Sequence, residues 1–207
     1  MSRLMTTRRR PSPDQRTGRE AGVSLVEMAV ATALLSAVLA LVYGAMWSSS
    51  TYGANLQKRT DLLAATRLAL DSFQRDVRQA YTGDQTTPVI ESMSATQITF
   101  FSPDRGTPMR LRKIVYRLNG TSLERSTTIS TNTDTPPWTF PGTAGAFQVV
   151  LKDVVNAPAF VYRDINGAVT ATPGAVRNID VTLDVGASLS TPGPQRHLLT
   201  INLRSAA

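Results

Sequence analysis

Two hydrophobic patterns follow one another along the first part of the chain. No residue is charged between Met28 and Gln57, and the first two-thirds of this stretch are apolar apart from two hydroxyl residues and Gly44. At about 1.5 Å per residue, such a stretch matches the hydrocarbon core of a bilayer, which is about 30 Å thick. The pattern predicts a membrane helix over residues 23–47.

The second pattern is amphipathic. After a polar stretch over residues 48–55, apolar residues recur at helical spacing. They are Leu56, Leu63, Leu70 and Val77, with Thr66, Phe73 and Ala80 between them. Proline is missing from residues 23–81, so nothing local breaks a helix there. We expect residues 48–81 to continue the first helix, in one element on the order of 90 Å long.

Beyond residue 81 the pattern changes to short strands separated by turns. Strands are predicted at Gln97–Ser102, Lys113–Leu118, Thr121–Ser126, Phe147–Leu151, Ala159–Arg163, Ala168–Thr170, Val176–Val185 and Leu198–Arg204. Asn119-Gly120 and Asn166-Gly167 accept the positive φ angles of tight hairpin turns and predict two hairpins. The expected fold is therefore α+β: the long helix packs on an antiparallel β-sheet head formed by residues 82–207.

The stretch Ser126–Pro141 is polar and rich in proline, which predicts a surface loop. It carries Trp138 and Phe140. Such rings can contact a partner, but we expect them to fold back onto the head, because large aromatic side chains bury most of their surface.

The basic charge is concentrated at one end. The formal net charge is +7, and residues 1–22 contain six arginines against two acidic residues, which is +4 of that total. Short basic segments beside a membrane helix stay in the cytoplasm. The charge pattern predicts a cytoplasmic N-terminus, a single membrane pass and an extracytoplasmic head.

One carboxylate, Glu27, stands at the start of the apolar run. The segment Gly22-Val23-Ser24-Leu25-Val26-Glu27 resembles the prepilin cleavage motif, although valine stands at position 23 where the family usually has phenylalanine. The resemblance implies that prepilin peptidase removes residues 1–22 by cutting between Gly22 and Val23, and methylates the amine of Val23. Glu27 would then set the register between subunits. The alternative is a signal-anchor helix with an interfacial glutamate.

The head resembles the minor pilins and pseudopilins of the PilW and GspJ kind. The segments that carry the resemblance are 70–79, 114–118, 160–164, 179–183 and 199–204. It implies a structural subunit of a type IV pilus or type II secretion pseudopilus, with sister subunits and the inner-membrane assembly platform as partners. Gly44 would allow the helix to melt locally, or would be a small residue at a helix contact. Alternatives are a permanently anchored binding domain and a tip pilin that binds DNA or a surface.

Motifs for catalysis, nucleotides or metals do not occur in the sequence. Cysteine is absent and His197 is the single histidine, so we expect no enzyme, no cofactor and no metal site. His197 is expected to be a solvated residue at the start of the last strand. Asp164-Ile165-Asn166-Gly167 has oxygen ligands at alternate positions, but a tight turn explains it better than calcium.

A basic cluster surrounds the first predicted hairpin: Arg110, Arg112, Lys113, Arg117 and Arg125. The DNA-uptake pilin of a competence system would use such a patch on phosphates. A solvated sheet edge that avoids strand pairing is the plainer interpretation.

Overall fold

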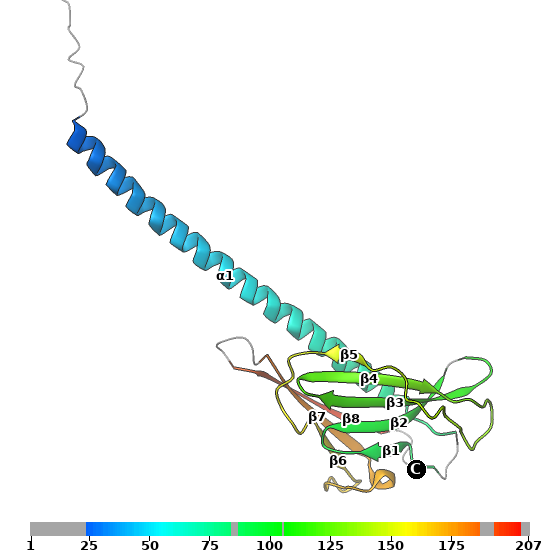
Figure 1. Cartoon of the computed structure of the whole chain (residues 1–207). Helices are drawn as coiled ribbons and strands as arrows, with labels where there is room; N and C mark the ends of the chain where they lie inside the picture. Colours follow the sequence, from blue (N-terminus) through cyan, green and yellow to red (C-terminus); the bar gives the residue numbers. More distant parts are fainter. Residues whose placement is uncertain (1–23, 84–86, 105, 187–192, 204–207) are drawn as a thin grey trace, which may run out of the picture. The chain divides into compact units, whose positions relative to one another are not determined.

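The computed structural model describes residues 24–83, 87–104, 106–186 and 193–203. One long helix is followed by strands (Figure 1), with these bounds: α1 (Leu25–Arg78), β1 (Ile90–Met93), β2 (Gln97–Asp104), β3 (Arg110–Asn119), β4 (Ser122–Ile129), β5 (Gln148–Leu151), β6 (Phe160–Arg163), the short 3₁₀ helix η1 (Pro173–Ala175), β7 (Asn178–Val185) and β8 (Gln195–Asn202). The chain divides into two compact units after Thr51. The second unit, from Tyr52 onward, contains the end of α1 and all of these strands.

The α+β prediction is confirmed. Helix α1 runs without a break from the apolar segment into the amphipathic segment, as the absence of proline predicted. It ends at Arg78, a few residues before the expected Tyr81, and Arg75 and Arg78 lie in its last turn. Basic residues there interact favourably with the negative end of the helix dipole.

The strands form two antiparallel sheets, not the single sheet that the sequence predicts. Strands β1 to β5 are neighbours in chain order in a five-stranded sheet. Its centre is the predicted hairpin of β3 and β4, in which Asn119 pairs with Ser122 and Gly120 has a φ of 59°. Strand β1 was not predicted, because its four residues carry two polar side chains and no clear alternation.

The second sheet has the order β6-β7-β8. The hairpin expected at residues 159–170 is wrong in its second half, because β6 pairs with β7 and only an isolated bridge joins Arg163 to Val169. The tight turn itself is present, since Asp164 N donates to Ala168 O at 2.9 Å. The turn was predicted correctly because it depends on neighbouring residues. The partner strand was predicted wrongly because it depends on contacts with residues far away in the sequence.

The core of the second unit gathers side chains from α1 and from both sheets. Phe73 of α1 lies at its centre, with ring-centroid distances of 4.9 Å to Tyr116, 5.7 Å to Phe160 and 6.4 Å to Phe100. The buried residues of α1 are Thr66, Ala69, Phe73, Asp76 and Val77. Of the expected apolar stripe, Phe73 and Val77 lie in this core, whereas Leu56 is 64% exposed and lies outside it.

Residues 130–147, which we call the strap, cover part of the outer face of the five-stranded sheet. Phe140 stacks on Phe101 with ring centroids 5.6 Å apart. The indole N–H of Trp138 donates to Thr82 O at 2.7 Å. The expectation that both rings fold back onto the head is confirmed, although the loop begins after Ile129 and not at Ser126.

Candidate assembly site

The first half of α1 exposes an apolar surface. Its large side chains are uncovered all around the helix: Leu25, Val26, Met28, Val30, Leu34, Leu35, Val38, Leu39, Leu41, Val42, Met46 and Trp47 are each at least half exposed. By length and composition this helix can cross a membrane, a property that a signal sequence near an N-terminus shares. A continuous surface of this kind is stable only against lipid or other apolar helices.

The hydroxyl groups in this half of α1 are satisfied within the helix. Thr32 Oγ1 donates to Met28 O at 2.9 Å, and Ser36 Oγ donates to Thr32 O at 2.7 Å. Farther along, Thr51 Oγ1 donates to Trp47 O at 3.0 Å. These bonds matter in an apolar environment, where water cannot replace a missing partner. The side chains between Met28 and Trp47 are therefore compatible with hydrocarbon.

The carboxylate of Glu27, in contrast to these side chains, is not compatible with hydrocarbon while it is charged and unpaired. Glu27 lies in the first turn of α1, where the positive end of the helix dipole favours a carboxylate. Within the described residues no cation lies within ion-pair distance of its side chain. The predicted cleavage and methylation positions, Gly22 and Val23, lie outside the described residues. Their roles stay predictions, as does the register role of Glu27.

Gly44 does not interrupt the helix. Helix α1 continues through it, and a Cβ atom at this position would have no atom within 4 Å other than those of its chain neighbours and of the local helix backbone. Its expected role in local flexibility stays a prediction.

A buried polar cluster joins α1 to the five-stranded sheet. The carboxylate of Asp76 accepts hydrogen bonds from Tyr116 Oη and Arg125 Nε, each at 2.8 Å. Burial, followed by the charge of Asp76, raises the pKa of Tyr116 well above its ordinary value, so this hydroxyl stays a donor. The sequence contained one signal for this cluster, since an acidic residue at a buried position of the helical stripe needs a partner.

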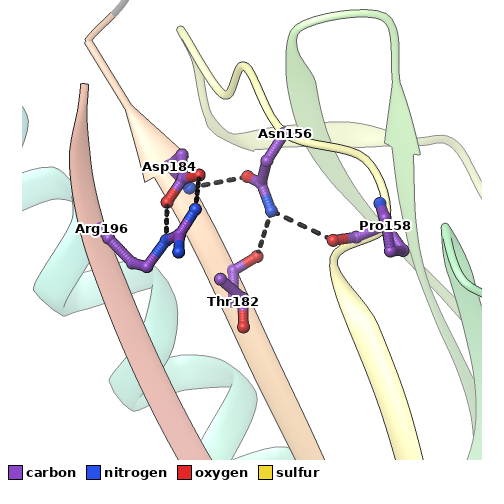
Figure 2. Close-up of polar contacts among 5 residues, drawn as sticks. All are labelled: Asn156, Pro158, Thr182, Asp184 and Arg196. Atoms are coloured by element: carbon purple, nitrogen blue, oxygen red, sulfur yellow. Dashed lines mark hydrogen bonds and ion pairs between the residues drawn. The ribbon is translucent and has the colours of Figure 1, made fainter. Parts of the chain in front are cut away.

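Strand β7 carries the second polar network, which Figure 2 shows. The Asn156 side-chain amide donates to Thr182 O at 2.7 Å and to Pro158 O at 3.1 Å, and its oxygen accepts from Asp184 N at 2.6 Å. The carboxylate of Asp184 accepts two hydrogen bonds from Arg196, both at 2.8 Å. Asn156 therefore fixes the segment before β6 against β7. No local pattern in the sequence pointed to this role.

The first half of α1 is apolar and exposed, and its second half packs on antiparallel sheets. This layout is pilin-like. No family model matches the chain, and no curated protein matches it.

Three residues of the predicted basic cluster each form an ion pair with one carboxylate. Lys113 pairs with Glu91 at 2.6 Å, Arg117 with Glu124 at 2.8 Å, and Arg125 with Asp76 at 2.8 Å. The interpretation as a solvated sheet edge is wrong, because β3 and β4 are interior strands. The pair of Arg117 and Glu124 joins the neighbouring strands β3 and β4, and the pair of Arg125 and Asp76 joins β4 to α1. The pair of Lys113 and Glu91 joins β3 to β1, across the strand β2 that lies between them.

Two further expectations concerned His197 and the turn at residues 164–167. His197 is not solvated: it is partly buried, and its Nε2 atom is buried without a hydrogen-bond partner. The carboxylate of Asp164 accepts from Asn166 N at 2.8 Å and from Ala168 N at 2.9 Å. These bonds use the carboxylate to hold the turn, in agreement with the turn interpretation.

Proposed function

We propose that this chain is a structural, non-enzymatic subunit of a type IV pilin-like filament, namely a minor pilin or pseudopilin. One observation supports it above the others. Helix α1 offers an apolar surface with satisfied hydroxyls at one end and contributes Phe73 to the core of a β head at the other. Such a helix can reside in a membrane and later pack on sister helices without changing its own hydrogen bonds.

Processing would complete the site around Glu27. An unpaired acid at mid-membrane costs about 2.5 to 3.5 kcal/mol, and less near the interface, so Glu27 needs a cation. Cleavage between Gly22 and Val23 creates a positive amine at the start of the same helix. In a filament, the amine of one subunit and the Glu27 carboxylate of its neighbour would neutralise each other in apolar surroundings.

The proposal includes a location and partners. The precursor would cross the cytoplasmic membrane once, with the basic residues 1–22 in the cytoplasm and the head outside. Prepilin peptidase, the inner-membrane assembly platform and sister pilins would be its partners, and the final location would be a type IV pilus or a type II secretion pseudopilus. The apolar half of α1 is the surface that supports contacts with sister subunits.

The decisive experiment is mass analysis of the protein from membranes of cells with and without prepilin peptidase. We expect a chain that begins at Val23 and is one methyl group heavier, only in cells that contain the peptidase. An intact leader in both strains would contradict the proposal and favour a permanently anchored extracytoplasmic domain.

A second experiment separates processing from assembly. Glu27→Gln keeps the shape of the side chain but removes its charge, so we expect cleavage to continue and incorporation into sheared filaments to fall at least tenfold. Ser36→Ala is the matched control, because Ser36 bonds only within its own helix. Equal incorporation of both variants would contradict the proposed role of Glu27.

A further inference from the structure

The two sheets expose edges that differ in how well they are protected. An unprotected edge strand is a template for another strand. Strands β1 and β5 have only four residues each, and their pairing contains a shift in register. Strand β6 also has four residues, and its edge is used by a bond from Phe160 N to Ala95 O at 3.1 Å. These edges offer little to a partner.

The remaining edge, that of β8, is long and regular. Its eight residues pair with β7 without a shift in register. It contains no proline, and within the described residues no other strand pairs with it. Three devices that blunt an edge are therefore missing from β8, namely a short length, a proline and a bulge.

The register shows which backbone groups are free. Thr182 N donates to Ala159 O, so the even-numbered residues of β7 direct their backbone N–H and C=O groups toward β6. The odd-numbered residues of β7 direct these backbone groups toward β8. Within β8, the odd-numbered residues therefore bond to β7. The even-numbered residues direct their N–H and C=O groups outward: Arg196, Leu198, Thr200 and Asn202. In the described part of the chain, none of these backbone groups has a hydrogen-bond partner.

The side chains beside this edge carry little net charge. Arg196 is held by two bonds to Asp184 at 2.8 Å. Thr200 Oγ1 donates to Asp180 at 2.7 Å, and Asp180 is itself paired with Arg163 at 2.6 Å. Leu198 stands between them and is 68% exposed. An apolar residue on a neutral strand edge suits another uncharged extended strand.

We propose that β8 pairs with β8 of a second copy of this chain, antiparallel and about a two-fold axis, so that two three-stranded sheets become one continuous sheet. A register centred on Leu199 places Leu198 opposite Thr200 of the other copy and Arg196 opposite Asn202 of the other copy. It uses every free backbone group of the four outward residues, in about eight hydrogen bonds.

Charge and symmetry favour a second copy as the occupant. In this register the two Arg196 side chains lie at opposite ends of the paired strands, about 20 Å apart at 3.4 Å per residue. The two Leu198 side chains become diagonal neighbours, which apolar residues on paired strands favour. The edge of β8 therefore matches the same edge of a second copy in length, polarity and charge. Such self-complementarity is what a two-fold interface requires. This pairing needs no filament, so it stands or falls independently of the proposed function.

The cysteine-free sequence allows a direct test of the register. In the proposed dimer the two Leu199 residues form a non-hydrogen-bonded pair, with Cα atoms about 4.5 Å apart, within the range of a disulfide. We expect full-length Leu199→Cys, purified in mild detergent and gently oxidised, to form a disulfide-linked dimer. Asn202→Cys on the same strand is the matched control and should stay monomeric, because it would be about 20 Å from its copy. Equal cross-linking of both variants would overturn the proposal.

A charge substitution tests the pairing without cysteine. Leu198→Lys places two cations at neighbouring positions and should weaken the dimer at least tenfold in analytical ultracentrifugation of the full chain in detergent. The control is Ile165→Lys, since Ile165 is 79% exposed and lies in the turn after β6. A monomer at all concentrations, or a dimer that Leu198→Lys leaves unchanged, would overturn the proposal.

Discussion

At the scale of single residues, the head depends on carboxylates that hold segments far apart in the sequence. Asp76 is the most buried of them, with 9% of its surface exposed, and it serves both Tyr116 and Arg125. Replacing it removes the carboxylate that a buried hydroxyl and a partly buried guanidinium share as an acceptor. Removing one partner of such a cluster lowers the free energy of unfolding by more than the cluster contributes to it. The reason is that the remaining polar groups stay buried, where water cannot replace the lost hydrogen bonds.

Asp76→Ala should therefore lower the free energy of unfolding by about 2 to 3 kcal/mol. Urea unfolding of the full chain in mild detergent would measure this. Asp71→Ala is the control, because Asp71 is exposed on the same helix and should change stability by less than about 0.5 kcal/mol. Equal effects of the two substitutions would show that Asp76 does not anchor α1.

Asp180 makes the stability of the head depend on pH in the acidic range. Burial alone would raise the pKa of Asp180, but hydrogen bonds from Arg163 and Thr200 outweigh burial and hold the pKa below its ordinary value. A carboxyl group with a lowered pKa in the folded state stabilises the fold above its unfolded pKa of about 4, and this contribution is lost as the pH falls through the folded value.

We therefore expect stability to decrease as the pH falls below about 5, and Asp180→Asn to make this decrease shallower. Urea midpoints measured across this range test the slope. Asp71→Asn, at an exposed site, should keep the wild-type slope. A slope that Asp180→Asn leaves unchanged would assign the acid sensitivity to other carboxylates.

At the scale of elements, the strap shows how a loop without regular structure can be held in place. Ser126 Oγ donates to Gly145 O at 2.6 Å, and Gly145 N donates to Thr128 Oγ1 at 2.8 Å. The backbone of the strap therefore lies directly on β4 at this point. A Cβ atom at Gly145 would overlap the carbonyl oxygen of Thr127. Glycine is required here by close approach of two backbones, not by its φ angle.

Gly145→Ala should displace the strap and lower the free energy of unfolding by about 1 to 3 kcal/mol. The fluorescence of Trp138 should report the change, since its indole bonds to Thr82 O in the folded state. Gly142→Ala is a matched control in the same loop, because a Cβ atom there would have no atom within 4 Å. If both variants unfold like the wild type, the strap is not held at Gly145.

At the scale of the whole molecule, the chain separates an exposed apolar helix from a head that has its own core. The buried apolar residues all lie between Ala69 and Ile201, within the second compact unit. Because the amphipathic part of α1 contributes Ala69, Phe73 and Val77 to this core, that part of the helix belongs to the head. The apolar part of α1 contributes none of it.

A fragment of residues 52–207 should therefore fold and stay in solution without detergent, whereas residues 80–207 should not. Loss of a buried phenylalanine such as Phe73 alone costs about 3 to 5 kcal/mol, a large part of the stability of a domain. Dispersion of amide signals in NMR spectra distinguishes the two outcomes. Aggregation of the longer fragment, or folding of the shorter one, would contradict this division.

Features that depend on neighbouring residues could be predicted correctly from the amino-acid sequence. The uncharged run after Glu27 and the absence of proline determined one long helix, because helix formation follows local propensity and spacing. Asn119-Gly120 determined the central hairpin, because its positive φ angles suit a tight turn between adjacent strands.

Contacts between distant segments, in contrast, became known from the three-dimensional fold. The strands form two sheets, and β6 pairs with β7 instead of with residues 168–170. Asp76 binds Tyr116 on β3 and Arg125 on β4. The fold also showed that β8 has a free edge and that Gly145 lies against β4. These features depend on contacts between residues far apart in the chain, and several partners are locally equivalent until the core around Phe73 selects one arrangement.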